Sequence, residues 1–266
     1  MCPSSAGRGL YDAAVDDRAA SKVAGWYAAL EGRHLERLAF SEVRRALQAL
    51  SSLYVERRDR LGSGGAFNSA GKRAAYALFY GPLHFWTVRE IVRALRAAEP
   101  PLNHIVDLGC GTGAAGAAWA FEAGGRPAVL GIDTSGWAIG EAEWSLEKLG
   151  VTATVRRGRL LDARLGKPGE GIVAAYVANE LDDPSRAVLL RRLLAAHAGG
   201  SRVLVVEPIA RRPIPFWPAW ADAFREAGGR ADTWRFPCDL PERMRLLDKA
   251  AGLDHRELTA RSLWLG

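Results

Sequence analysis

Three closely spaced glycines that follow an acidic residue form the part of this chain best suited to chemistry. Residues 105–113 are Ile-Val-Asp-Leu-Gly-Cys-Gly-Thr-Gly, and an alanine-rich segment of helical character comes next. Glycine has no Cβ, so such a turn can adopt positive φ and lets a ligand lie against bare backbone. The start of the next helix offers unpaired N–H groups and the positive end of a dipole. The segment therefore predicts a site for a nucleotide-like ligand that carries a negative group.

Further polar residues come directly after apolar segments along the chain. We expect strands at 103–108, 128–133, 151–157, 171–178 and 202–207, helices at 113–123, 136–149, 184–197 and 216–227, and a closing antiparallel strand near 262–265. Apolar strands that alternate with helices predict a parallel sheet covered on both faces. Ligands of such sheets bind at the carboxyl ends of the strands. That edge would bring together Asp107, the glycines, Asp133, the 158–162 loop, Asn179-Glu180 and Glu207-Pro208.

Asp133 ends the second expected strand, about 20 residues after Gly113. A carboxylate in this place can accept both hydroxyls of a ribose, and its alternative role is to cap a helix that begins near Gly136. The spacing of Gly109, Gly111 and Ala114 also fits a dinucleotide fingerprint. Because Asp107 enters the turn and a third glycine stands at 113, a nicotinamide-dependent dehydrogenase is disfavoured.

An apolar strand, an acidic residue and G-x-G-x-G together resemble the first motif of the class I S-adenosylmethionine-dependent methyltransferases, over about residues 100 to 266. The resemblance implies an α/β fold with a Rossmann-like doubly wound sheet, and S-adenosylmethionine as cofactor. In that family the residue at Asp107 helps to hold the amino group and the residue at Asp133 holds the ribose. The implied cofactor-binding residues are Asp107, Gly109, Cys110, Gly111, Gly113, Asp133, Thr134, Leu161, Asp162 and Asn179.

One position departs from the family pattern. Many members have an acidic residue near the adenine amino group, directly after the glycine at the end of the third strand, and here Arg159 stands there. Either Asp162 or a backbone group takes that role, and Asp162 could equally be a solvated loop charge. The family places the residues nearest the transferred methyl group after the fourth strand, which points to Asn179 and Glu180.

Four residues are candidates for catalysis: Asn179, Glu180, Tyr80 and His84. Glu180 could act as a general base or orient a donor of the substrate; alternatively, it pairs with Arg211 or Arg212. Tyr76, Tyr80 and His84 share one helical face before the first strand, where they either meet the substrate or pack as aromatic core.

Several chemistries are disfavoured by missing residues. The Asn/Asp-Pro-Pro-aromatic sequence of enzymes that methylate exocyclic base amines is absent after the fourth strand. No cysteine lies between 110 and 238, where cytosine C5 enzymes need a nucleophile. Cys2, Cys110 and Cys238 form no metal-ligand pattern, so no metal site is expected.

A closer resemblance surrounds this core. A-A-Y-A-L-F-Y-G-P-L precedes it, N-E-L comes after the fourth strand, V-V-V-E-P ends the fifth, and F-P-C lies further on. Together these are similar to methyltransferase-like proteins linked to the mitochondrial small ribosomal subunit and to their bacterial relatives. The resemblance implies an RNA or ribosomal partner. Mitochondrial members carry a cysteine-ligated iron–sulfur cluster, but Cys238 alone cannot build a four-cysteine site here.

Residues 1–10 are expected to be a disordered tail, 11–98 an N-terminal helical region that caps the site, and 99–266 the cofactor-binding domain. Val43, Leu47 and Leu50 recur at helical spacing, and the opposite face carries Arg44, Arg45, Arg57 and Arg58. A loop is expected at 61–68 and a helix break at Gly81-Pro82.

The net charge of +6 admits a nucleic-acid partner. No apolar run approaches the roughly 20 residues that span a bilayer, and few cysteines make a cytoplasmic location the default. The first hypothesis is an S-adenosylmethionine-dependent methyltransferase that acts on RNA or the small ribosomal subunit. The alternatives are a small-molecule methyltransferase with a helical lid and a non-catalytic, cofactor-binding ribosome assembly factor.

Overall fold

The computed structural model describes residues 5–56, 67–124, 126–209 and 214–266, with side chains described from residue 17 onward in the first of these ranges and up to residue 51. Arg57, Arg58, Arg211 and Arg212, and most of the expected 61–68 loop, therefore lie outside the described residues. No helix in the described ranges is both long enough and apolar enough to cross a membrane.

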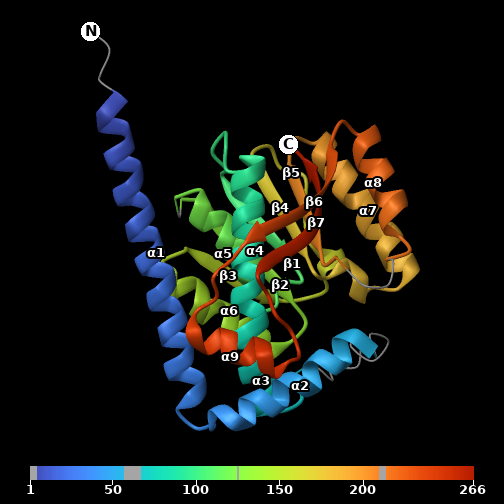
Figure 1. Cartoon of the computed structure of the whole chain (residues 1–266). Coiled ribbons are helices and arrows are strands. Elements are labelled where there is room, and N and C mark those ends of the chain that lie inside the picture. The colour runs from blue at the N-terminus through green and yellow to red at the C-terminus, as the bar shows by residue number, and fades with distance from the viewer. Residues whose placement is uncertain (1–4, 57–66, 125, 210–213) are drawn as a thin grey trace.

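Seven strands form one mixed sheet (Figure 1). They are β1 (His104–Leu108), β2 (Ala128–Asp133), β3 (Ala153–Arg157), β4 (Glu170–Ala175), β5 (Arg202–Glu207), β6 (Arg230–Pro237) and β7 (Glu257–Leu265). Their order is β3-β2-β1-β4-β5-β7-β6, in which β1 to β5 are parallel and β7 is antiparallel to β5 and β6. The predicted Rossmann-like α/β fold and closing strand are confirmed. The order reverses between β1 and β4, the switch point at which such sheets bind ligands.

The sheet separates two apolar cores, because successive side chains of a strand point to opposite faces. Val173 and Leu204 pack on the face that carries α4, α5 and α6, whereas Ile172 and Val205 pack on the face that carries α7 and α8. These helices are α4 (Gly81–Leu95), α5 (Ala114–Glu122), α6 (Gly136–Lys148), α7 (Asp183–Ala198) and α8 (Trp217–Glu226).

The strands differ from the prediction in several places. Strand β3 begins at Ala153 rather than at residue 151, and β7 begins at Glu257, before the expected 262–265. Strand β6 is not among the predicted strands, because it is an edge strand whose residues alternate between partly buried and exposed positions and form no apolar run. Strand β4 ends at Ala175 rather than at residue 178. The next residue, Tyr176, has φ of 59° and turns the chain out of the strand direction.

The N-terminal helices run along one side of the molecule and across one of its ends (Figure 1). They are α1 (Ser5–Leu35), α2 (Phe40–Glu56), α3 (Ala70–Ala75) and a π-helix (Tyr76–Tyr80) that continues into α4. Helix α1 thus begins within the segment expected to be a tail. In Figure 1, α2 and α3 lie at the end of the molecule opposite to the C-terminus. Because Leu265 pairs with Val203 at the amino end of β5, α2 and α3 lie at the carboxyl edge.

The expected helix break at Gly81-Pro82 is wrong. The Gly81 N–H donates to the Tyr76 carbonyl, which closes the π-helix, and α4 continues without interruption. Pro82 lies in the first turn of α4, where its missing N–H would have no intrahelical partner in any case.

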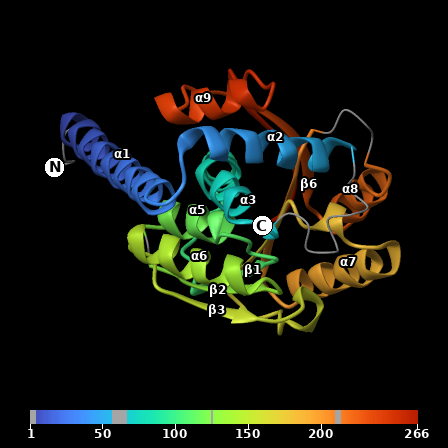
Figure 2. The ribbon, with the colours of Figure 1, turned by 90° about the horizontal axis from the view of Figure 1, so that it is seen from below.

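Helix α2 lies between α3 and α9 (Glu242–Ala250), as Figure 2 shows. Val43, Leu47 and Leu50 are fully buried, which confirms the predicted apolar face, and Arg44 and Arg45 are exposed. Helix α2 is therefore packed between α3, which follows it in the chain, and α9, which lies near residue 250.

A buried carboxylate ties α1 to α6. Glu141 of α6 is 2% exposed; His34 Nε2 lies 2.7 Å from its Oε1, and Arg33 Nε donates to its Oε2 over 3.3 Å. A buried carboxylate is tolerated only where such partners replace its water. Glu141 therefore holds the end of α1 against the sheet domain.

We expect Glu141→Ala to lower the free energy of unfolding by about 2 kcal/mol, because the buried pair loses one member while Arg33, half exposed, can turn to solvent. Urea denaturation measures the change. Glu143→Ala, an exposed neighbour on the same helix, is the matched control and should be neutral. Equal losses in the two variants would contradict the role given to Glu141.

Candidate functional site

The glycine turn has the backbone conformation that its sequence predicts. Gly109, Gly111 and Gly113 have φ of 68°, 52° and 78°, the left-handed region that favours glycine. A Cβ on Gly109 would lie 2.5 Å from Val177, so the turn also packs too closely against the end of β4 for any side chain. The glycines are thus required by conformation, and at Gly109 also by space.

Several N–H groups of the turn and of the first turn of α5 bond within the protein. Gly109 and Cys110 donate to the Ile132 carbonyl, and Gly113 donates to that of Cys110. Gly116, in the first turn of α5, donates to Asp107 Oδ2 over 2.8 Å. These N–H groups therefore donate to acceptors of the protein itself.

Asp133 holds two turns at once. Its Oδ2 accepts from the Gly111 N–H at 2.9 Å, and its Oδ1 accepts from the Ser135 N–H at 2.8 Å. The alternative role as cap of the next helix is wrong, because Ser135 is the N-cap of α6 and accepts from the Ala138 N–H. Asp133 is half-buried, so part of its carboxylate surface faces solvent above the glycine turn.

Four carboxylates influence one another at this edge. Burial raises the pKa of Asp107 to about 7, opposed by the Gly116 hydrogen bond and assisted by Asp133. The side chain of Glu180 is exposed, but nearby protein atoms and the charge of Asp133 raise its pKa to about 7. Burial raises the pKa of Glu207 to about 7. Among the described residues no three His, Cys, Asp or Glu side chains are grouped to hold a metal ion. This edge of the sheet is therefore acidic.

A 3₁₀ turn over Ala178–Glu180 carries two of the catalytic candidates. The backbone N–H and the side-chain amide of Asn179 both donate to Glu207, a residue at the end of β5 that is completely buried. In the described parts of the chain Glu180 forms no ion pair, and its alternative partners Arg211 and Arg212 lie outside them. Asn179 is thus fixed to the sheet, while Glu180 faces outward beside Asp133.

The remaining cofactor candidates flank the ends of β2 and β3. Thr134 is exposed, and its carbonyl accepts from Arg157 Nε. Leu161 is half-buried and Asp162 exposed, in a short 3₁₀ turn (Leu160–Asp162) directly after Arg159. Cys110 differs from these, because its thiol is buried, a Cβ on Gly131 would lie 3.0 Å from it, and burial raises its pKa. Only the backbone of Cys110 can therefore face a ligand.

The π-helix docks on the glycine turn. A Cβ on Gly111 would lie 3.4 Å from the Tyr76 hydroxyl, and one on Gly81 would lie 2.9 Å from Thr112 Oγ1. The Tyr80 hydroxyl forms a hydrogen bond with Ser51 of α2, so this side chain ties the π-helix to the cap. π-Helical turns occur often at functional sites because the extra residue re-aims side chains. Here that turn aims Tyr76 at the glycines and Tyr80 at α2.

His84 stacks on Tyr176. The ring centroids are 3.7 Å apart and the planes differ by 13°. Burial lowers the pKa of His84 to about 3, so the imidazole is neutral at physiological pH. The ring of Tyr76 lies 6.3 Å from that of His84, and Tyr80 lies 6.1 Å from it. The aromatic face predicted before β1 thus contacts the end of β4.

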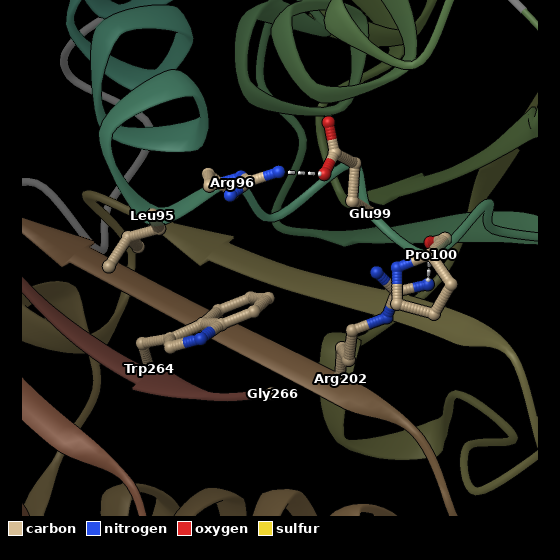
Figure 3. A pocket seen from close by; sticks show the side chains of 7 residues that line it. All are labelled: Leu95, Arg96, Glu99, Pro100, Arg202, Trp264 and Gly266. Carbon is tan, nitrogen blue, oxygen red and sulfur yellow. Dashed lines mark hydrogen bonds and ion pairs between the residues drawn. The ribbon is translucent and has the colours of Figure 1, made fainter.

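A pocket at the opposite edge of the sheet contains none of the predicted site residues (Figure 3). Arg202 at the start of β5 lines it and donates to the carbonyls of Ala97, Pro100 and Pro101. The Arg96–Glu99 ion pair lies beside it. Because Arg202 is engaged by the segment that leads into β1, we assign this pocket a structural role.

Two residues of the site have roles that sequence reasoning missed. The sequence analysis places Glu207 at the end of a strand but gives it no role. A carboxylate at the end of a wholly buried strand is itself a signal of a functional site. Tyr176 is expected to continue β4, and nothing in its sequence surroundings indicates a left-handed conformation, which is rare outside glycine and asparagine.

Several solved structures resemble the structure of this chain, at low sequence identity. The methyltransferase domain of the bacterial protein CtHen1-C is 14% identical with a TM-score of 0.47, over 68% of this chain and 97% of that chain. Magnesium protoporphyrin IX methyltransferase from Synechocystis PCC 6803 with bound SAM is 17% identical with a TM-score of 0.45, over 82% and 95%. Precorrin 8W decarboxylase from Methanobacterium thermoautotrophicum is 21% identical with a TM-score of 0.44, over 67% and 89%. The sequence matches no protein-family model and no curated protein.

We expect Asp107→Asn to stabilise the ligand-free protein at pH 8 but not at pH 5. The folded-state pKa of this acid, about 7, exceeds its unfolded value. The folded state therefore binds more protons between these values, and the stability of the wild type falls as pH rises from about 4 to 7. Asparagine carries no charge, yet its side-chain oxygen can still accept from Gly116.

Urea denaturation at several pH values measures the effect, which should reach a few kcal/mol above pH 7. Asp222→Asn, on the exposed face of α8, is the matched control. Parallel pH profiles for the wild type and Asp107→Asn would show that the Asp107 carboxylate costs no stability.

Proposed function

We propose that this protein is an S-adenosylmethionine-dependent methyltransferase. The observation that carries the proposal is the acidity of the glycine turn. Asp107, Asp133 and Glu180 surround it, and its N–H groups at 109, 110, 111 and 113 are already bonded within the protein. A pyrophosphate needs free N–H donors and no nearby anions, which disfavours a dinucleotide. A sulfonium and an ammonium group suit these carboxylates, so the residues fit this cofactor.

Each residue has a part in that proposal. Asp107 would hold the ammonium group, Asp133 the ribose hydroxyls, and the bare backbone of Gly109, Gly111 and Gly113 would lie against the methionine portion. Thr134, Leu161 and Asp162 would border the adenine. The chemistry that the cofactor supplies when bound is an electrophilic methyl group on a cationic sulfur.

The protein must then align the acceptor and remove its proton. Methyl transfer in line with the leaving sulfur needs mainly proximity and orientation. Glu180 has a pKa of about 7 and lies beside Asp133, so it can take up a proton near neutral pH. Asn179, bonded twice to Glu207, would fix the turn that carries this base. Tyr76 and His84, both half-buried near the glycine turn, would border the acceptor.

We propose RNA as the acceptor. Exposed arginines lie at the carboxyl edge on both sides of the site: Arg44 and Arg45 on α2, and Arg157 and Arg159 at the end of β3. Guanidinium groups at these places can contact phosphates and orient a nucleic acid without specifying its sequence. The net charge of +6 supports the same partner.

A small-molecule acceptor is the second candidate. The observation that favours it is the close contact of the cap with the glycine turn, at Gly81 against Thr112 and at Tyr76 against Gly111. A cap in such contact suits a substrate small enough to be enclosed, and a helical lid also excludes water from the reaction.

Calorimetric titration with S-adenosylmethionine, S-adenosylhomocysteine and NAD tests the cofactor. We expect micromolar binding of the first two, none of NAD, and at least about tenfold weaker binding by Asp133→Ala, which loses charged hydrogen bonds. Asp222→Ala is the control. Because cation binding favours ionised carboxylates whose pKa is about 7, affinity should rise from pH 6 to pH 8 and protons should be released. Binding of NAD alone would overturn the proposal.

Filter binding of RNA at increasing salt tests the acceptor. RNA binding should weaken steeply, and each phosphate contact contributes about 0.7 to the logarithmic salt slope for single strands. Arg44→Ala/Arg45→Ala should therefore lower the slope by about 1.4, whereas Arg225→Ala on α8 should leave it unchanged. RNA affinity that is absent, or independent of salt, would favour the small-molecule acceptor.

A further inference from the structure

The chain leaves β4 through a backbone conformation that its residue does not favour. Tyr176 comes directly after the last residue of the strand, Ala175, with φ of 59°. Left-handed φ is uncommon for a bulky side chain, and such residues persist only where the surroundings hold them. They also cluster at functional sites. The interactions that hold Tyr176 therefore influence the position of the residues after it in the chain.

Three interactions hold Tyr176, and two come from α4. Its N–H donates to the Val206 carbonyl over 2.8 Å, which keeps it attached to β5. Its ring stacks on His84 at 3.7 Å, and its hydroxyl forms a hydrogen bond with Thr87. His84 and Thr87 are three residues apart on one helical face, so α4 contacts the side chain of Tyr176 from one side.

The conformation at Tyr176 sets the position of the turn behind it. Val177 comes next and fills the space that the missing Cβ of Gly109 leaves. The Glu180 N–H then donates to the Val177 carbonyl, and Asn179 is bonded to Glu207. A β-conformation at residue 176 would extend the strand and carry Asn179 and Glu180 away from the glycine turn.

We infer that Tyr176 is a positioning residue: its ring, gripped by His84 of α4, holds the chain in the left-handed conformation that places the Asn179–Glu180 turn beside the glycine loop. The N-terminal region thereby sets the geometry of the residues closest to the acceptor. The inference deepens the proposed function and rests on it for the role of the turn. The conformational part holds for the ligand-free protein and can be tested without a cofactor.

The reporter is the carboxyl group of Glu180, followed by NMR titration of protein labelled with ¹³C at glutamate carboxyl groups and assigned with Glu180→Gln. Its pKa reflects the protein atoms around it and Asp133, with Tyr76 and Glu207 as the other titratable neighbours. If the turn moves away from Asp133 and the protein atoms around it, the midpoint of Glu180 falls from about 7 toward the ordinary value for glutamate.

Substitutions at Tyr176 and His84 test whether the stacking of the two rings holds the backbone conformation. Tyr176→Phe and His84→Phe keep the stack and should titrate like the wild type. Tyr176→Leu and His84→Leu lose the stack, and the midpoint of Glu180 should fall by about one pH unit or more. Phe236→Leu removes a similar stack on Trp234 at the sheet edge and should change nothing at Glu180. Folded Tyr176→Leu and His84→Leu proteins with the wild-type midpoint would overturn the inference.

Tyr176→Gly covers the case in which Tyr176→Leu fails to fold, because glycine adopts the left-handed conformation without a Cβ. A folded glycine variant with the wild-type midpoint supports the inference, because glycine supplies the conformation that the ring otherwise holds, and a lowered midpoint would overturn the link between that conformation and the position of the turn. Titration of the same proteins with S-adenosylmethionine separates the two proposals. If the wild type does not bind it while the midpoints shift as expected, the proposed function fails and the positioning role stands.

Discussion

The carboxyl edge of this molecule depends on a buried carboxylate at a helix start. Asp107 is 1% exposed and accepts the Gly116 N–H from the first turn of α5. A helix start attracts anions because its N–H groups are unpaired and its dipole is positive. Asp107 supplies such an anion from within the fold, and it makes this edge of the sheet acidic. The neighbouring Asp133 and Glu180 extend that acidity across the glycine turn.

Such an arrangement trades stability for binding. Carboxylates whose pKa is raised by burial are held in an unfavourable ionised state near neutral pH, and a bound cation relieves that cost. The site is therefore poised for a ligand of opposite charge. The same reasoning explains why the aromatic residues around it are suitable neighbours, since Tyr76 and Tyr176 border the carboxylates without neutralising them.

The sequence predicts the parallel part of the sheet well and the edge strand β6 poorly. Strands β1, β2 and β5 are largely buried apolar runs that end in a carboxylate or a glycine turn, and such runs are clear without a structure. Edge strand β6 has no such pattern, because its residues alternate between partly buried and exposed positions.

The site was predictable only where local signals exist. Positive φ at Gly109 agrees with the residue type, whereas the left-handed conformation of Tyr176 arises from packing against His84, more than ninety positions earlier in the chain. The π-helix likewise depends on how Gly81 fits against Thr112, a contact that the sequence does not indicate.

The packing of α2 against α9 has a consequence for synthesis of the chain. Helix α2 leaves the ribosome early, but α9 and its Arg243, which pairs with Glu31 of α1, come close to the end. At about 5–20 residues per second the N-terminal helices wait on the order of ten seconds or more for their partner. During that time α3 is the partner available to α2, so its packing is incomplete and nascent chains of this protein should depend on chaperones more than those of proteins whose early helices need no late partner.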